Sequence, residues 1–248
     1  MTQSSFSMSL HGRHEPFELQ VARGQIPYHS VVSIYGYQPV VGTSFIPAWE
    51  VASTYTFPSS AAVMTIASAS GATDANVQVK ISGLDSSYGI LSETVTLNAS
   101  GTANTTNSFY RINSMNITTG APAGNITAKT GGTTYAQINT GINRTQMSIY
   151  SVPAGYTFYL NRAQGFTSTV YTASQYATYR SQTTVSSVTS IFAQRPFVGN
   201  FAIDRTYPTV YAATTDIQWQ VNVNTGNAAV GLAFEGVLIA NDGTSVGY

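Results

Sequence analysis

The chain has 248 residues, and its ten basic and ten acidic residues leave a formal net charge of zero. Charged residues make up only 8% of the sequence, against about 25% in a typical soluble protein. So few and so scattered basic residues cannot build an extended basic surface, and nucleic acid is therefore not an expected partner. The high content of aromatic and β-branched residues excludes a disordered chain, and the length suffices for one large domain or two smaller ones.

Cysteine is absent, which excludes disulfides, thiolate metal sites and a cysteine nucleophile. The first ten residues carry neither a basic nor an apolar region, so we expect no signal peptide. No stretch approaches the roughly 18 apolar residues of a membrane-spanning helix, and a membrane is not an expected partner either.

The first 30 residues differ from the rest of the chain, because they show neither sustained alternation nor clean helical spacing. Pro16 and Pro27 discourage a continuous helix. We therefore predict an extended N-terminal arm over residues 1–30, whose apolar side chains lie against another surface. The alternative is a strand and loop packed on the chain's own body. The predicted contact residues of the arm are Phe17, Leu19, Val21 and Ile26.

From residue 31 onward, runs of alternating polar and apolar residues predict β-strands. Residues 76–82 and 93–98 alternate without interruption, and the turn-forming residues at 82–89 predict that the two strands form a hairpin. Residues 216–223 place one apolar set on a single face, namely Ile217, Trp219, Val221 and Val223. Further alternating runs cover residues 111–118, 146–151 and 156–160.

Strands that recur at short spacing between clusters of Gly, Asn and Pro are typical of an antiparallel β-sandwich or jelly roll. We expect a first lobe over residues 31–145 and a second over residues 146–248, or a single domain, because the composition does not change at that boundary. Residues 164–180 contain Ala, Gln and Tyr that would support a short helix. Their Thr and Val content favours strand or irregular structure instead.

The sequence offers little material for a catalytic site. His11, His14 and His29 all lie in the predicted arm, away from a rigid scaffold, so a serine–histidine–carboxylate site is not expected. No glycine-rich phosphate-binding motif occurs. The carboxylates outside the arm are few: Glu50, Asp74, Asp85, Glu93, Asp204, Asp216, Glu235 and Asp242. Asp85 and Asp216 lie where turns are expected. We predict that the protein is not an enzyme and holds neither a cofactor nor a metal.

The 16 tyrosines have two interpretations. Tyrosine gives a large contact area at a low entropy cost, and it is favoured in recognition surfaces, including those that bind carbohydrate. It is also a good strand former in any β protein. The candidates for recognition are Tyr171, Tyr176 and Tyr179, and a host surface glycan is the candidate ligand.

Several short motifs follow one another in a characteristic order: PFELQVARGQI at 16–26, GLD at 83–85 with Glu93, FYRI at 109–112, GNI at 124–126, VPAG at 152–155 and TDI at 215–217. In order and spacing they resemble a family of virion structural proteins of tailed phages that infect marine and freshwater bacteria, including cyanophages. The resemblance runs from about residue 15 to 240, and nothing matches between 164 and 200. It implies a particle component with no catalytic residues to carry over.

Residues and resemblance together predict a non-enzymatic virion structural protein, assembled in the host cytoplasm, that acts by symmetric assembly. We expect a homo-oligomer that contacts major capsid or tail proteins. A capsid decoration (cement) protein is the first expectation. The alternatives are a tail, neck or nozzle component, and a module that binds a host receptor or glycan.

Overall fold

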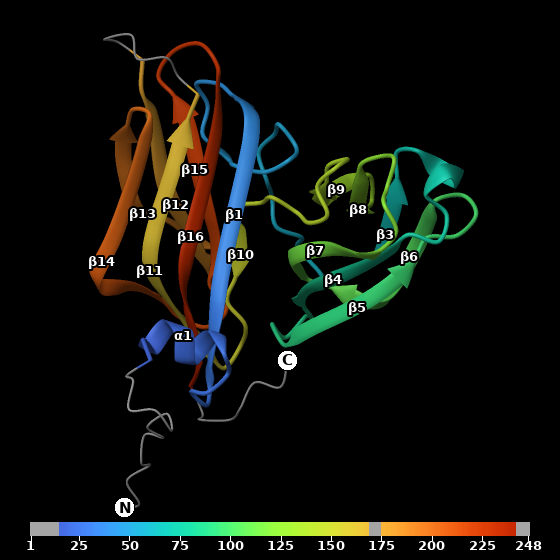
Figure 1. Cartoon of the computed structure of the whole chain (residues 1–248), viewed down its shortest axis with the longest axis horizontal. Coiled ribbons are helices and arrows are strands. Elements are labelled where there is room, and N and C mark those ends of the chain that lie inside the picture. The colour runs from blue at the N-terminus through green and yellow to red at the C-terminus, as the bar shows by residue number, and fades with distance from the viewer. Residues whose placement is uncertain (1–14, 169–174, 242–248) are drawn as a thin grey trace, which may run out of the picture.

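The computed structural model describes residues 15–168 and 175–241. Over these residues antiparallel strands form several sheets that pack face to face in two lobes (Figure 1). The predicted class, an all-β antiparallel sandwich, is confirmed. Two short helical segments accompany the strands there, α1 (Phe17–Ala22) and the 3₁₀ helix η1 (Gly71–Asp74). No helix in the described ranges is long and apolar enough to cross a membrane.

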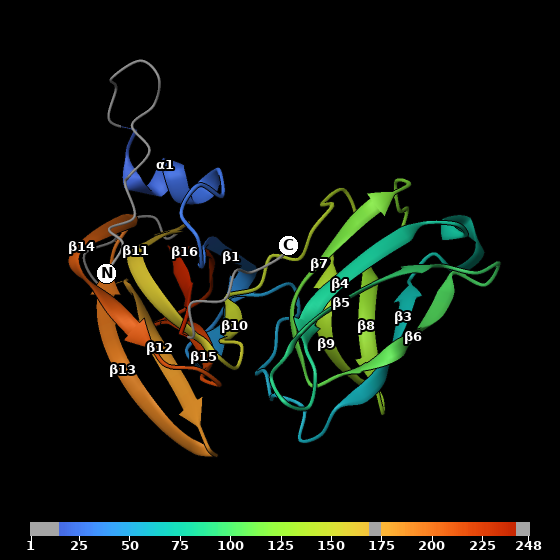
Figure 2. The ribbon, with the colours of Figure 1, turned by 90° about the horizontal axis from the view of Figure 1, so that it is seen from below.

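One lobe, here called the split lobe, is built from both ends of the described chain. Its first sheet has the strand order β1 (His29–Val41), β16 (Ala228–Ala240), β11 (Tyr156–Thr167) and β14 (Asn200–Tyr211). Its second sheet has the order β10 (Ile149–Ser151), β15 (Asp216–Val223), β12 (Ala177–Val185) and β13 (Val188–Phe197), with β2 (Ile46–Pro47) paired to β15. Figure 2 shows the two sheets face to face, with α1 lying across the outer face of the first.

The other lobe, here called the inserted lobe, comes from the middle of the chain. One of its sheets has the order β6 (Thr102–Phe109), β3 (Ala62–Ser68), β8 (Ile126–Thr130) and β9 (Thr133–Ile138). The other has the order β5 (Ile90–Thr96), β4 (Gln78–Leu84) and β7 (Arg111–Thr119). Each lobe has its own hydrophobic core, and the chain's two tryptophans are divided between them, with Trp219 in the split lobe and Trp49 in the inserted lobe.

The predicted first lobe, residues 31–145, therefore has the wrong beginning. β1 pairs with β16 over almost its whole length, from His29 opposite Ile239 to Val41 opposite Ala228, so the start of the predicted first lobe belongs to the split lobe. Alternation shows which face of a strand is buried, but it carries no information about which distant strand lies alongside. The insertion of β3–β9 between β2 and β10 therefore leaves no mark in the pattern.

The described part of the predicted arm is not extended, because residues 17–22 form α1. Pro16 precedes the first turn of the helix, where its missing N–H costs nothing. Gly24 adopts a φ of +67° after the last turn, and its N–H bonds to the carbonyl of Val21 at 2.9 Å, which ends the helix. Proline and glycine thus mark the two ends of a short helix here. β1 then begins at His29, before the predicted end of the arm.

The predicted hairpin is confirmed. β4 and β5 pair from Gln78 opposite Thr96 to Leu84 opposite Ile90. Asp85 holds the connecting turn, because its carboxylate accepts hydrogen bonds from the N–H groups of Ser87 and Gly89 at 2.8 and 2.9 Å. In the doubtful stretch 164–180, the described residues form the end of β11 and the start of β12, and no helix appears among them.

Residues 216–223 form β15, as predicted, but both faces of this strand are buried. Trp219 stacks on Phe234 of the opposite sheet, with the ring centroids 4.0 Å apart. On the other face Gln218 donates a hydrogen bond to the carbonyl of Tyr55 at 3.2 Å. The polar positions of β15 therefore face the connection to the inserted lobe, whereas the alternating pattern indicated solvent.

The chain crosses between the lobes twice, and Ser148 joins both crossings to β15. Its backbone N–H and its hydroxyl bond to Ala48, at 2.8 and 2.9 Å, and its carbonyl and hydroxyl bond to Trp219, at 2.9 and 2.7 Å. Gly36 of β1 packs against the same point, where an added Cβ would lie 2.2 Å from the carbonyl oxygen of Ala48. Only glycine fits this approach.

Candidate functional site

The split lobe ends in an open edge, formed by β13 and β14, the terminal strands of its two sheets. No strand in the described ranges pairs with the outer side of β13, and nearly all side chains of β13 are exposed. These include Val188, which is 68% exposed, and Phe192, which is 60% exposed. The strand carries a single charged residue, Arg195. Natural edge strands are often protected by several charges, and β13 has one.

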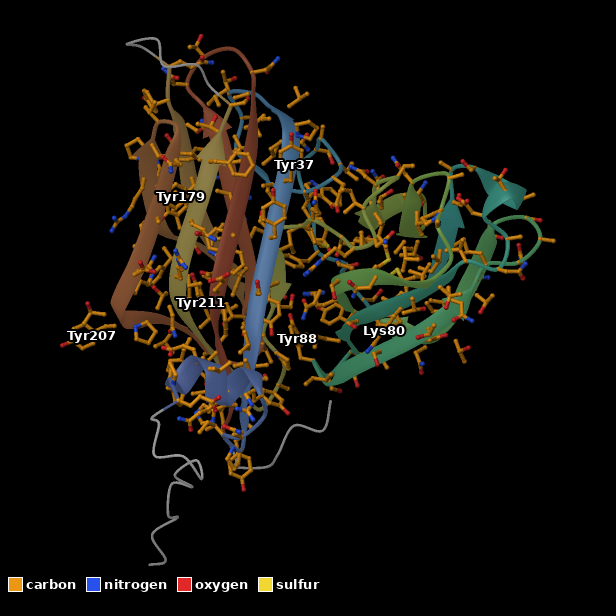
Figure 3. All side chains as sticks on the ribbon, in the orientation of Figure 1. Tyr37, Lys80, Tyr88, Tyr179, Tyr207 and Tyr211 are labelled. Atoms are coloured by element: carbon orange, nitrogen blue, oxygen red, sulfur yellow. The ribbon has the colours of Figure 1, made fainter. Side chains whose placement is uncertain are left out.

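Two irregularities push large side chains out of this open edge. Phe192 is an extra residue in β13, between the pairs Gln182–Ile191 and Ser181–Ala193. In β14, residues 205–208 bulge out between the pairs Leu160–Thr209 and Arg162–Asp204. Tyr207 lies in that bulge, is 87% exposed and points away from the body in Figure 3. Bulges are common at sheet edges, where they redirect side chains.

A tight turn at residues 186–187 joins β12 to β13. Ser186 and Ser187 adopt φ values of 48° and 68°, as a two-residue type I′ turn requires. This hairpin projects beyond the rest of the split lobe in Figure 2. Sequence reasoning missed it because Asn-Gly and Asp-Gly are the usual signals for such a turn, and Ser-Ser is not.

The four predicted contact residues of the arm do not act as one set. Phe17 and Leu19 are each 47% exposed on α1, which leaves them available for a partner. Val21 is only 3% exposed and packs on the chain's own body, and Ile26 is half-buried. Phe17 also makes an edge-to-face contact with His29, at 5.8 Å between the ring centroids. His11 and His14 lie outside the described residues.

The three recognition tyrosines are likewise not brought together. Tyr171 lies outside the described residues, and Tyr176 is exposed. Tyr179 is buried and stacks on Phe201 at 4.7 Å, so the structure contradicts a recognition role for it. On a strand of a two-layered sandwich every second side chain faces the core, and Tyr179 occupies such a position. Tyr207, the most exposed aromatic residue of ranges 15–168 and 175–241, was not among the candidates.

A buried ion pair between Arg111 of β7 and Asp216 of β15 clasps the two lobes together. The two side chains are joined by parallel hydrogen bonds, Nε to Oδ1 at 2.8 Å and Nη2 to Oδ2 at 2.7 Å. The remaining guanidinium N–H groups bond to the carbonyls of Pro58 and Tyr110, both at 2.8 Å, and to the hydroxyl of Tyr88 at 3.0 Å. All five donors of the guanidinium are therefore satisfied.

Aromatic rings surround the guanidinium of this clasp. Its carbon lies 3.7 Å from the ring centroid of Tyr110, 5.0 Å from that of Phe57 and 5.3 Å from that of Tyr88. Burial, together with the charge of Asp216, raises the pKa of Tyr88 to about 12. Asp216 also accepts a hydrogen bond from the hydroxyl of Ser151 at 2.6 Å. Asp216, predicted as a turn residue, is thus a structural acceptor between the lobes.

A second buried carboxyl lies at the same junction. Oε1 of Glu50 accepts a hydrogen bond from the backbone N–H of Gln146, and Oε2 has no hydrogen-bond partner among the described residues. Burial raises the pKa of Glu50 from 4.5 to about 8. The folded protein therefore keeps this carboxyl protonated at neutral pH, whereas the unfolded chain ionises it.

We expect Glu50 to make folding stability fall as the pH rises from about 4.5 to about 8. In that window the folded state binds the extra proton, so the free energy of unfolding decreases with pH, by at most about 1.4 kcal/mol per pH unit. Glu50→Gln should flatten this slope in urea unfolding curves measured at several pH values. Glu18→Gln, on the exposed face of α1, is the control. An unchanged slope in Glu50→Gln would contradict the assignment.

Asp74 and Glu93 have local structural partners. Asp74 accepts hydrogen bonds from the N–H groups of Ala123 and Gly124 at 2.7 and 3.0 Å. Glu93 accepts them from those of Thr106 and Asn107 at 2.7 and 2.9 Å. Glu235 lines a groove between α1 and the first sheet of the split lobe. Over the ranges that the structure covers, no three His, Asp or Glu side chains are grouped to hold a metal ion.

Comparison with known proteins identifies no family and gives one weak structural similarity. No protein-family model and no curated protein matches the sequence. Among solved structures, the chain has a weak similarity to the structure of infectious bursal disease virus Gx strain, at 11% identity and a TM-score of 0.23, covering 86% of this chain and 75% of the other. A TM-score at that level does not demonstrate a shared fold.

Proposed function

We propose that this protein is a structural component of a virus particle, which works without catalysis by binding copies of itself and neighbouring virion proteins. Within that class, we propose a capsid decoration (cement) protein. The observation that carries the proposal is the open edge, where β13 and β14 expose Val188, Phe192 and Tyr207. The motifs that resemble phage virion proteins support the same role.

The backbone and the side chains of the open edge both suit contact with another protein. The unpaired backbone groups of an edge strand can add a strand from another chain, and the apolar side chains supply further affinity. Burying one large apolar side chain contributes about 1.5–3 kcal/mol before the costs of ordering. Phe17 and Leu19 on α1 offer a second contact surface. Repetition of such contacts on a symmetric shell turns modest affinities into strong attachment.

The clasp between the lobes supports the same proposal in a different way. Two sandwiches joined only by flexible linkers would lose orientational freedom when both contact a shell. The ion pair of Arg111 and Asp216 holds the lobes together beforehand, and the four hydrogen bonds of Ser148 fix the crossings between the lobes to β15. A body organised in this way suits a fixed position on a particle.

Purified protein should bind preassembled particles that lack it and raise the temperature at which they release their genome, because a ligand that binds only the assembled state stabilises that state. The same preparation is added to host cells in parallel. Binding to cells without stabilisation of the shell would contradict the proposal in favour of a receptor-binding module. No binding to either would favour a tail or neck component, which acts only within its own connector.

A further inference from the structure

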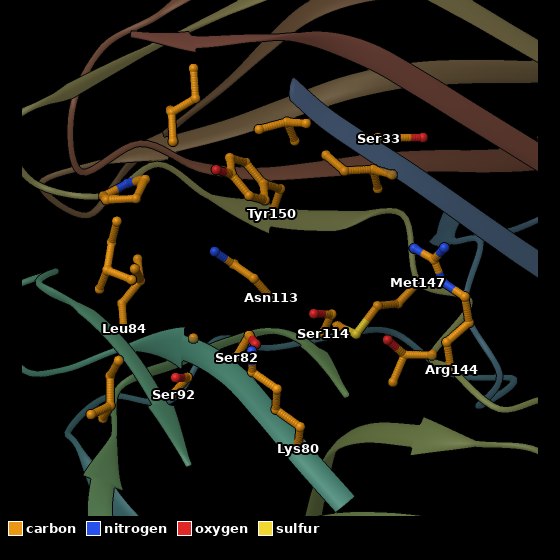
Figure 4. A pocket seen from close by; sticks show the side chains of 18 of the residues that line it. Ser33, Lys80, Ser82, Leu84, Ser92, Asn113, Ser114, Arg144, Met147 and Tyr150 are labelled. Atoms are coloured by element: carbon orange, nitrogen blue, oxygen red, sulfur yellow. The ribbon is translucent and has the colours of Figure 1, made fainter. Parts of the chain in front are cut away.

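A cleft of about 430 Å³ lies between the two lobes, and its lining residues belong neither to the open edge nor to the clasp. Its volume falls within the range of about 300–1,000 Å³ that is usual for small-molecule sites. The outer face of the sheet β5-β4-β7 forms one wall, and β1 and the segment around Tyr150 form the other (Figure 4). The cleft therefore exists only because the lobes are held in this arrangement.

Strand register arranges the polar side chains of the first wall in two rows. Ser82 of β4 pairs with Ser92 of β5 on one side and with Ser114 of β7 on the other, so three hydroxyls stand in line. Two residues along β4, Lys80 pairs with Asn116, which in turn is bridged to Arg144. Directly opposed residues share a face of the sheet. Lys80 and Arg144 thus stand on the same face as the serines, about 10 Å apart at two strand spacings.

Within the described ranges, neither Lys80 nor Arg144 forms an ion pair, and the hydroxyls of Ser82, Ser92 and Ser114 make no side-chain hydrogen bond. The described lining of the cleft contains no Asp or Glu, and the nearby Glu93 instead bonds to β6. In a chain with only ten basic residues, two of them share one small cleft without a carboxylate.

We infer that this cleft binds an acidic saccharide, with Lys80 and Arg144 taking its carboxylate groups and the serine row its hydroxyls. A ligand for two rows must carry negative charge and many hydroxyls together, which is the chemistry of a uronic-acid oligosaccharide. An acidic peptide carries the same negative charge but presents fewer hydroxyls to the serine row. Two cations on a protein of zero net charge are too few for nucleic acid. Tyr35 and Val31 on the opposite wall provide an apolar surface for the sugar ring.

The test is calorimetric titration with oligogalacturonate, with neutral dextran and a single-stranded DNA oligonucleotide as comparison ligands. The wild-type protein should bind oligogalacturonate and not dextran. Lys80→Gln with Arg144→Gln should weaken binding by a factor of about 10 or more, as the loss of charged hydrogen bonds implies. The matched control, Lys129→Gln with Arg195→Gln, removes the same charge elsewhere and should leave binding unchanged.

Ser82→Ala with Ser114→Ala separates saccharide recognition from simple charge attraction. It keeps both cations, and it should weaken binding of oligogalacturonate. Three results would overturn the inference. These are binding of DNA as tight as that of oligogalacturonate, a loss of binding in the control Lys129→Gln with Arg195→Gln as large as that in Lys80→Gln with Arg144→Gln, and no binding of oligogalacturonate at all. The site does not depend on the open edge, so the Lys80 and Arg144 variant should still stabilise particles. Failure of one proposal therefore leaves the other intact.

Discussion

Asp216→Asn is expected to destabilise the protein by about 3–5 kcal/mol, because it leaves the charge of Arg111 buried without a counter-ion. Both side chains are almost completely buried, and the carboxylate accepts hydrogen bonds from Arg111, Ser151 and Tyr88. Arg111→Met should lower the free energy of unfolding by a similar amount, because it leaves the carboxylate of Asp216 buried without a counter-ion. The double variant Arg111→Met with Asp216→Asn should cost less than the two single losses together, because no charge is left unpaired.

The measurement is urea unfolding followed by tryptophan fluorescence. Trp219 reports on the split lobe and Trp49 on the inserted lobe, so Trp219→Phe and Trp49→Phe backgrounds separate the two transitions. The control is Asp204→Asn, which breaks an ion pair with Arg162 on the surface and should cost less than about 1 kcal/mol. A loss from Asp216→Asn as small as that of the control would contradict a structural clasp.

Replacing Val188 and Ile191 by lysine should abolish particle binding while leaving the fold intact. Both side chains are exposed on β13, so the change costs little folding energy, and lysine is the residue that natural edge strands use against association. Loss of two apolar contacts of about 1.5–3 kcal/mol each weakens attachment by a factor of about 100 or more. The readout is co-sedimentation with particles that lack the protein.

The control for this pair is Val63→Lys, at an exposed position of β3 in the inserted lobe. It adds the same kind of charge on the other lobe and should leave co-sedimentation unchanged. Full particle binding by the variant with lysines at 188 and 191 would show that the open edge is not the attachment surface.

Local features of the fold could be predicted from the sequence, and long-range ones could not. The β4–β5 hairpin depends on two alternating runs and a turn closed by Asp85, all within about twenty residues, and it was predicted. The pairing of β1 with β16 joins segments about two hundred residues apart. Nothing in an alternating strand specifies so distant a neighbour, because many strands offer the same pattern.

The contact between Arg111 and Asp216 also joins residues that are far apart in the sequence, and it could not be predicted. Arg111 lies within FYRI and Asp216 within TDI, two of the motifs that carry the resemblance to virion proteins, but their separation of 105 positions concealed the contact. The open edge did leave a signal, because Val188, Ile191 and Phe192 break strict alternation. The bulge at Phe192 accounts for that break. Such departures from period two mark irregular strands, where side chains are redirected.

The most direct test of assembly through the open edge is a cryo-electron microscopy reconstruction of particles that carry this protein. We expect the protein at symmetry-related positions on the capsid, with β13 and β14 buried against a neighbouring protein and Val188, Phe192 and Tyr207 in the contact. A reconstruction in which β13 and β14 face solvent in every copy would contradict the account.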